Sequence, residues 1–322
     1  MLKLNRFAVF AWGVLAYILL VILWGAVVRA TGAGAGCGSH WPLCNGEVIP
    51  HAPQTATLIE LSHRLTSGLA LPLIVALAIW AWRIYPRGHR VRKGAGLSVV
   101  FLLTEALIGA GLVRFELVAD NASVARALFM SIHLANTFVL IATLTATAWW
   151  ASGGSSLGFK GQESKLAFAF AVALAAVMVL GMSGAVAALG DTLFPVRSLA
   201  EGLRQDFSPT AHLLIRLRLL HPTIAIVAAG YIITLSAIVS LLRPDGLTKS
   251  FARLVIALNV VQLLVGALNV ALLAPIWLQL VHLLLADLIW IALILLASSA
   301  LAQRATNGAP AGALSLNRAL KV

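Results

Sequence analysis

Four histidines are the residues of this sequence best suited to chemistry, because each lies inside a long apolar stretch. They are His63, His133, His221 and His282. A hydrogen bond between helices explains a single histidine in such a place, but polar groups in lipid often mark a functional site. Each of the four lies about 8–10 Å from the same end of its stretch, at about 1.5 Å per helical residue.

Four imidazoles at one depth indicate two pairs of ligands, since a planar tetrapyrrole takes an axial ligand on each face. We pair His63 with His133 and His221 with His282, which predicts two haem sites. A zinc or di-metal site is the poorer alternative, because the clustered carboxylates and thiolates of such sites are missing.

The two histidine pairs have different neighbours. Glu60 precedes His63 by three residues, whereas Arg218 holds that position before His221. Residues three apart share a helix face, so Glu60 could transfer protons beside one haem or stabilise a developing cation. The alternative is an ion pair between Glu60 and Arg64, four residues further on.

Other charged and polar residues surround these positions. Guanidinium groups suit the carboxylates of haem propionates, although snorkelling to the membrane interface also explains them. Asn136 and Thr137 follow His133 by about one turn and are placed to hydrogen-bond there, while Glu105 has no assigned role. The candidate propionate contacts are Arg29, Arg64, Arg126 and Arg218.

Cys37 and Cys44, the only two cysteines, lie in one loop with Gly38 and Pro42 between them. Six intervening residues allow a closed loop. A structural disulfide, a redox-active pair and two free thiols are all compatible with this spacing.

The elements that position these residues must be membrane helices. Hydrophobic residues make up 61% of the 322 and charged residues 11%, which excludes a soluble enzyme, a disordered chain and a coiled coil. The net charge is +12, but the basic residues lie between apolar runs and form no nucleic-acid-binding face. Eight spans are predicted, at about 7–28, 58–82, 95–113, 127–150, 166–189, 215–242, 254–274 and 277–301.

The distribution of basic residues predicts the orientation of these spans. One side of the membrane carries 15 lysines and arginines and the other carries eight. The positive-inside rule then places both termini in the cytoplasm of a multi-pass plasma-membrane protein. The histidines and the cysteine loop lie toward the outer side.

An internal repeat divides the chain. Gly25 and Gly184, His63 and His221, and the Glu105 and Gln262 segments match at offsets of 157–159. Four spans per half predict a parallel repeat of two four-helix bundles. We predict an all-α membrane protein with bundles at 1–158 and 159–302, followed by a flexible cytoplasmic tail at 303–322.

These residues resemble the haem A synthase family over nearly the whole chain except the tail. The resemblance rests on the first loop, which ends Trp41-Pro-Leu-Cys44-Asn-Gly, and on Glu60-x-x-His63-Arg64. It rests further on Leu117-Val-Ala-Asp120, His133-Leu-Ala-Asn136-Thr137, Leu220-His221-Pro222 and His282. One departure is His40, where many relatives have an acidic residue before the Trp-Pro pair.

The resemblance implies oxidation of a methyl group of haem O to a formyl group, through hydroxylated intermediates, to give haem A for terminal oxidases. It implies that His63 and His133 hold the substrate haem and that Glu60 is catalytic. It also implies that His221 and His282 ligate a resident haem b, and that Cys37 and Cys44 form a disulfide. Haem O synthase and an electron donor are the expected partners.

Two other functions stay open from the residues. One is a di-haem electron-transfer protein of cytochrome b type, which leaves its porphyrin unchanged. The other is a transporter that uses the repeat for alternating access. Glu60 beside only one histidine pair favours the enzyme.

Overall fold

The computed structural model describes residues 4–155, 162–243 and 245–302, and these are mostly helical. Within those ranges the only strand-like feature is an isolated bridge between Cys44 and Glu47. The all-α prediction is confirmed. The predicted tail at 303–322 lies outside the described residues.

The helices are α1 (Arg6–Ala30), η1 (Ala33–Ala35), α2 (Thr55–Ile84), α3 (Arg90–Arg114), α4 (Val124–Ala151), α5 (Gln162–Leu193), α6 (Leu199–Asp206), α7 (Leu213–Arg218), α8 (Leu220–Leu242), α9 (Gly246–Ala271) and α10 (Ile276–Ala300).

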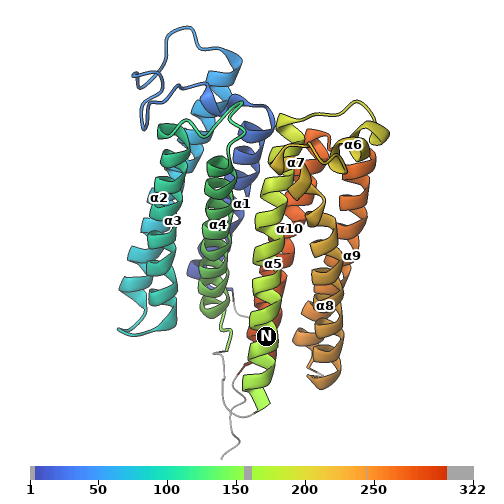
Figure 1. Ribbon diagram of the computed structural model, residues 1–322. Coiled ribbons are helices and arrows are strands. Elements are labelled where there is room, and N and C mark those ends of the chain that lie inside the picture. Colours follow the sequence, from blue (N-terminus) through green and yellow to red (C-terminus); the bar gives the residue numbers. More distant parts are fainter. Residues whose placement is uncertain (1–3, 156–161, 244, 303–322) are drawn as a thin grey trace, which may run out of the picture.

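The described residues contain eight helical segments that are long and apolar enough to cross a membrane, as predicted. They stand side by side as a bundle (Figure 1). The first-loop segment with its cysteines and the short helices α6 and α7 lie at one end of this bundle, opposite the start of α1.

One predicted boundary was wrong by eight residues. Helix α9 starts at Gly246 and not at 254, because Asp245 caps it by accepting a hydrogen bond from the Thr248 backbone N–H at 2.9 Å. The first two turns of α9 carry Lys249 and Arg253. Such polar turns extend a helix beyond the apolar core of a membrane, where hydropathy does not detect them.

The sixth predicted span corresponds to α7 and α8, which together form one candidate membrane span, Leu213–Leu242, interrupted only at Leu219. Helix α7 ends at Arg218 and α8 begins at Leu220, so the break falls next to His221. Pro222 has no N–H to donate, which is tolerated only in the first turn of a helix. The proline therefore lies where the new helix starts.

Helix contacts fall into two rings joined by a shared interface. In the first ring α1 packs on α2, α2 on α3, α3 on α4, and α4 on α1. In the second, α5 packs on α8, α8 on α9, α9 on α10, and α10 on α5. Helices α1 and α4 both contact α5 and α10. Pseudo-symmetry between the rings, and the domain limits, stay predictions.

Helix α10 is the most enclosed of the long helices, with every residue from 289 to 298 buried. A helix that is apolar on all sides belongs in the centre of a protein. Trp290 joins the two rings: its ring stacks on Phe138 of α4 at 4.9 Å, and its indole N–H donates to the Phe138 carbonyl at 2.7 Å.

Candidate functional site

Each of the four span histidines faces a glycine on a neighbouring long helix. In the first ring, a Cβ added to Gly25 of α1 would lie 3.0 Å from Cε1 of His63, and one on Gly109 of α3 would lie 3.7 Å from Cε1 of His133. These glycines leave room for the imidazole rings between the helices. His63 and His133 lie close enough to each other for charges on their rings to interact.

The second ring repeats this arrangement. A Cβ on Gly184 of α5 would lie 3.0 Å from Cε1 of His221, and one on Gly266 of α9 would lie 3.2 Å from Cε1 of His282. At such distances the neighbouring ring must give way. The glycines that mark the sequence repeat are therefore the ones against which the histidines lie.

His221 and His282 meet directly. Their ring centroids are 6.3 Å apart, with the ring planes at 82°. Two imidazoles on opposite faces of one metal ion place their centroids about 6 Å apart, because each metal–nitrogen bond takes about 2 Å and each ring adds about 1 Å. The Ser183 hydroxyl lies 3.0 Å from Nδ1 of His221.

The imidazoles fit the group that the sequence predicts. Nδ1 atoms of His63, His133 and His282 are buried without a hydrogen bond, and a buried polar atom without a partner is costly. Within residues 4–155, 162–243 and 245–302, His, Cys, Asp and Glu nowhere gather in threes as a metal site. Two pairs of histidines are suited to two haems.

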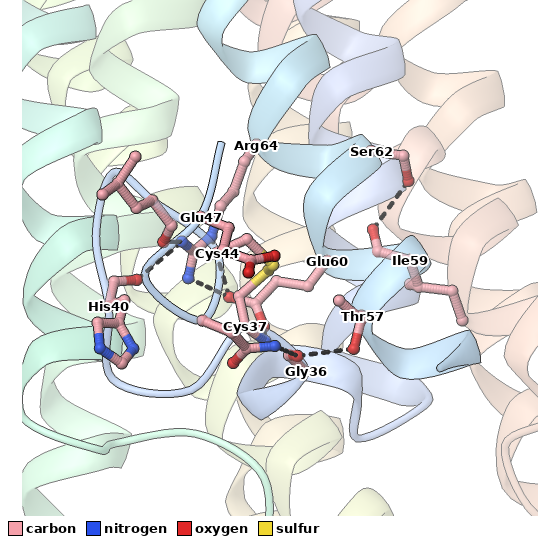
Figure 2. The surroundings of a disulfide bond; sticks show 12 residues. Gly36, Cys37, His40, Cys44, Glu47, Thr57, Ile59, Glu60, Ser62 and Arg64 are labelled. Carbon is pink, nitrogen blue, oxygen red and sulfur yellow. Dashed lines mark hydrogen bonds and ion pairs between the residues drawn. A yellow bond between two sulfur atoms is a disulfide. The ribbon is translucent and has the colours of Figure 1, made fainter. Parts of the chain in front are cut away.

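Glu60 lies under the cysteine loop and is almost fully buried. Its Oε2 accepts the Cys37 backbone N–H at 2.8 Å, and its Oε1 accepts Nη2 of Arg64 at 2.5 Å (Figure 2). The ion pair between Glu60 and Arg64, which was the alternative to a catalytic role, is thus present. The catalytic role itself stays a prediction.

Arg64 also holds the loop. Its Nη1 donates to the carbonyls of His40 at 2.8 Å and Leu43 at 2.7 Å (Figure 2). Gly36 packs so closely on α2 that an added Cβ would lie 2.4 Å from the backbone carbon of Ala56. The Arg64 guanidinium, a candidate propionate contact, therefore already donates hydrogen bonds to the loop.

Cys37 and Cys44 form a disulfide, which confirms the expected pairing. Both sulfur-bearing side chains are buried. Asn45 closes the base of the loop through a backbone hydrogen bond to the Cys37 carbonyl at 3.0 Å. The disulfide is thus part of a small rigid cap over Glu60.

Arg29 was a propionate candidate of the first half, yet its contacts lie in the second ring. Nη1 donates to the Ala188 carbonyl and to the Thr192 hydroxyl, each at 2.8 Å. Nη2 donates to Oε1 of Gln279 at 2.7 Å. Gln279 lies one turn from His282, so Arg29 reaches the neighbourhood of the second histidine pair.

The remaining candidate arginines also have protein partners. Arg126 donates to the carbonyls of Ala119 and Asn121, which holds the loop after α3. Arg218 donates to Asp191 at 2.8 Å and to Asp206 at 2.5 Å. Contact between these arginines and a haem propionate stays a prediction.

Two acidic residues lie within the helical bundle: Glu105, which had no predicted role, and Asp287, which sequence reasoning missed. Glu105 lies between α3 and α4, where its carboxylate meets His133, Asn136 and Thr137. Asp287 of α10 is fully buried, and neither of its carboxylate oxygens has a hydrogen-bond partner. In the sequence, each could have been noticed as an acidic residue within an apolar run.

Comparison with known proteins identifies the family of this chain. Residues 8–294 match the family described as cytochrome oxidase assembly protein. Two proteins named "Protoheme IX farnesyltransferase", from two strains of Thermus thermophilus, are 53% identical over 297 residues, which cover 92% of this chain and 49% of theirs. The chain thus spans about half the length of these curated relatives.

Shorter matches carry a different name. A "Heme A synthase" of Alkalihalophilus pseudofirmus is 46% identical over 98 residues, 30% of this chain and 33% of that protein. A "Heme A synthase" of a Bacillus cereus strain is 50% identical over 96 residues, 30% of this chain and 31% of that protein. Because the family match extends over most of the chain, this protein belongs to the cytochrome oxidase assembly protein family, the family of the haem A synthases.

Proposed function

We propose that this protein is a haem A synthase, a membrane oxidoreductase that converts a methyl group of haem O to the formyl group of haem A through hydroxylated intermediates. The observation that carries the proposal is the set of two histidine pairs, each ring lying on a glycine, in a chain of this family. The two relatives named "Heme A synthase" support the same activity.

The two pairs take different roles in this proposal. His63 and His133 hold the iron of the substrate haem O, and His221 and His282 hold a resident haem b. The unequal surroundings support this division. Glu60 precedes His63 by one turn, whereas Arg218 precedes His221 and is held by two aspartates.

Haem b, when bound, supplies one-electron redox chemistry. The chain's own groups do the rest. Glu60 is the acidic group nearest the substrate pair in sequence, and the hydrogen bonds from Cys37 and Arg64 fix its carboxylate at that end of α2. A carboxylate held so is suited to accept a proton from the reacting group or to stabilise positive charge that develops there.

The arginines and the cysteine loop shield this end of the site. Arg29, Arg126 and Arg218 lie at the ends of their spans, where guanidinium groups pair with carboxylates such as propionates. The loop closed by Cys37 and Cys44 covers Glu60 and limits the access of water. Exclusion of water strengthens every electrostatic interaction beneath the loop.

Membrane placement and partners follow from the same proposal. Both termini lie in the cytoplasm of a plasma-membrane protein, by the positive-inside rule. Farnesylation of protohaem produces haem O, and relatives of twice the length bear the name of that activity. A haem O synthase is therefore the partner that supplies the substrate, alongside an electron donor.

The test is haem analysis of membranes from cells that make haem O, with and without this protein, by chromatography and mass spectrometry. The proposal expects haem A or its hydroxylated precursor only when the protein is present. A di-haem cytochrome would leave haem O unchanged while binding a normal amount of haem b. A transporter would purify without a Soret band.

Glu60→Gln is the matched variant for the catalytic role. The amide keeps an oxygen acceptor for the Cys37 N–H but loses the charge. We expect formation of haem A to fall at least 100-fold, within the range typical of general acid–base groups, about 10²–10⁴-fold, while haem b absorbance is retained. Undiminished product would show that Glu60 only holds the loop.

A further inference from the structure

Glu105 joins three polar groups on one face of α4. Its Oε2 accepts from Nδ2 of Asn136 at 2.5 Å, and its Oε1 accepts from the hydroxyl of Thr137. The same Oε1 lies 3.3 Å from Nδ1 of His133. Residues 136 and 137 follow residue 133 by about one helical turn and share its face of α4. A single carboxylate from α3 therefore reaches all three.

Glu105 and His133 lie within ion-pair distance of each other but do not form a hydrogen bond. Nδ1 of His133 is buried and has no hydrogen-bond partner, although Oε1 of Glu105 is within reach. The other contacts of Glu105 fix its position, and the Thr137 hydroxyl that donates to Glu105 also lies 2.9 Å from the His133 carbonyl. A small rotation of the imidazole completes a hydrogen bond to a carboxylate that is already held in place.

The second ring has a neutral group at the matching position of the repeat, although it lies beside the other nitrogen of its histidine. Gln262 of α9 matches Glu105 in the repeat, and its Nε2 donates to the His282 carbonyl at 3.1 Å. That amide lies 3.4 Å from Nε2 of His282, and Nδ1 of His282 has no partner. The two sites therefore differ by one negative charge next to a histidine.

We propose that Glu105 is a positioning residue for His133, which accepts the Nδ1–H of the imidazole and leaves Nε2 for iron. The inference rests on the proposed function, in which His63 and His133 hold a haem. A carboxylate on the second nitrogen of a histidine ligand fixes its tautomer and raises its basicity. The more basic ligand stabilises ferric over ferrous iron, so the reduction potential at the first pair is lower than it would be with an amide.

The test measures reduction potentials in the full-length protein. The purified protein in detergent is loaded with iron protoporphyrin IX, and midpoint potentials are determined by spectroelectrochemical titration. His133→Ala identifies the transition that belongs to the first pair. Glu105→Gln should shift that transition to a higher potential and leave the second transition unchanged. Gln262→Glu should shift only the second transition, to a lower potential.

Thr104→Val is the control for a purely structural role. The Thr104 hydroxyl donates to Oδ1 of Asn136 at 2.6 Å, so it belongs to the same network without touching His133. We expect both potentials to be unchanged in this variant. If Glu105→Gln behaves like Thr104→Val, Glu105 only joins α3 to α4 and the inference is overturned.

The proposed function can fail separately. If His133→Ala leaves the spectrum and both transitions unchanged, His133 is not a haem ligand, and the ligand assignment fails together with this inference. If His133→Ala removes one transition but Glu105→Gln moves none, only the inference fails. Should Glu105→Gln not fold, Glu105→Asp decides: it keeps the charge but withdraws the carboxylate from Nδ1 of His133, so an unchanged first transition contradicts the inference.

Discussion

At the scale of single residues, the histidine rings have room because glycines, which have no side chain, face them on the neighbouring helices. Gly25, Gly184 and Gly266 would each bring a Cβ to within 3.0–3.2 Å of an imidazole carbon. Glycine inside a helix costs up to about 1 kcal/mol relative to alanine. The cost is accepted at these positions because any larger residue would displace a ring.

Gly184→Ala therefore tests the second histidine pair. The new Cβ would press on Cε1 of His221, so we expect haem b content to fall severalfold although helix propensity improves. Soret absorbance per mole of protein measures this. Gly230→Ala on α8 is the control, because a Cβ there meets nothing within 4 Å. Equal haem content in both variants would contradict the role of the glycine.

Asp287 is a buried acidic residue whose carboxylate forms no hydrogen bond. Both of its oxygens lack a hydrogen-bond partner, and the residue lies two positions before the enclosed stretch 289–298 of α10. An unsatisfied buried polar group costs about 1–3 kcal/mol, so Asp287→Leu should raise the free energy of unfolding by an amount of that order. Thermal unfolding in detergent measures the change. A fall in the midpoint temperature would show that Asp287 has a stabilising partner in the membrane.

At the scale of elements, the first loop is attached to α2 by a few directed contacts. The disulfide closes the loop, the Cys37 N–H donates to Glu60, and two loop carbonyls accept from Arg64. Loop and helix thus act as one unit, and the position of the Glu60 carboxylate depends on the loop being closed.

Replacing both cysteines by serine should loosen this unit. For a ring of about eight residues, loss of the cross-link costs about 2.5 kcal/mol by the chain-entropy estimate. We expect faster hydrogen exchange of the backbone amides in residues 36–46, measured by mass spectrometry, and reduced formation of haem A. A variant with native exchange rates but no product would instead assign the cysteines a redox role.

At the scale of the whole molecule, Arg29 connects the two rings. It belongs to α1, yet its three acceptors lie on α5 and α10. Together with the Trp290–Phe138 contact, it fixes the first ring against the second close to the second histidine pair.

Arg29→Ala should therefore affect a site in the other half of the chain. We expect lower haem b content, because the Ala188 and Gln279 acceptors lose their common donor near His221 and His282. Arg114→Ala at the end of α3 is the control, since this exposed arginine donates to the Ser39 carbonyl of the first loop. If both variants bind haem b like the wild type, Arg29 does not support the second pair.

The sequence alone determined the features that depend on local composition. Apolar runs of about 20 residues must be helices in lipid, which gave the eight spans. Polar residues inside those runs were conspicuous, so His63, His133, His221 and His282 could be named with Glu60. The early start of α9 was missed, because a capping aspartate outweighs hydropathy there.

The tertiary structure alone decided which groups meet. Glu60 faces the cysteine loop, Glu105 reaches His133, and Arg29 crosses to Gln279. Such contacts depend on the rotation of each helix about its axis and on its neighbours in the bundle. Neither is encoded in the period or spacing of one segment, because both arise from packing between residues as far apart in sequence as 29 and 279.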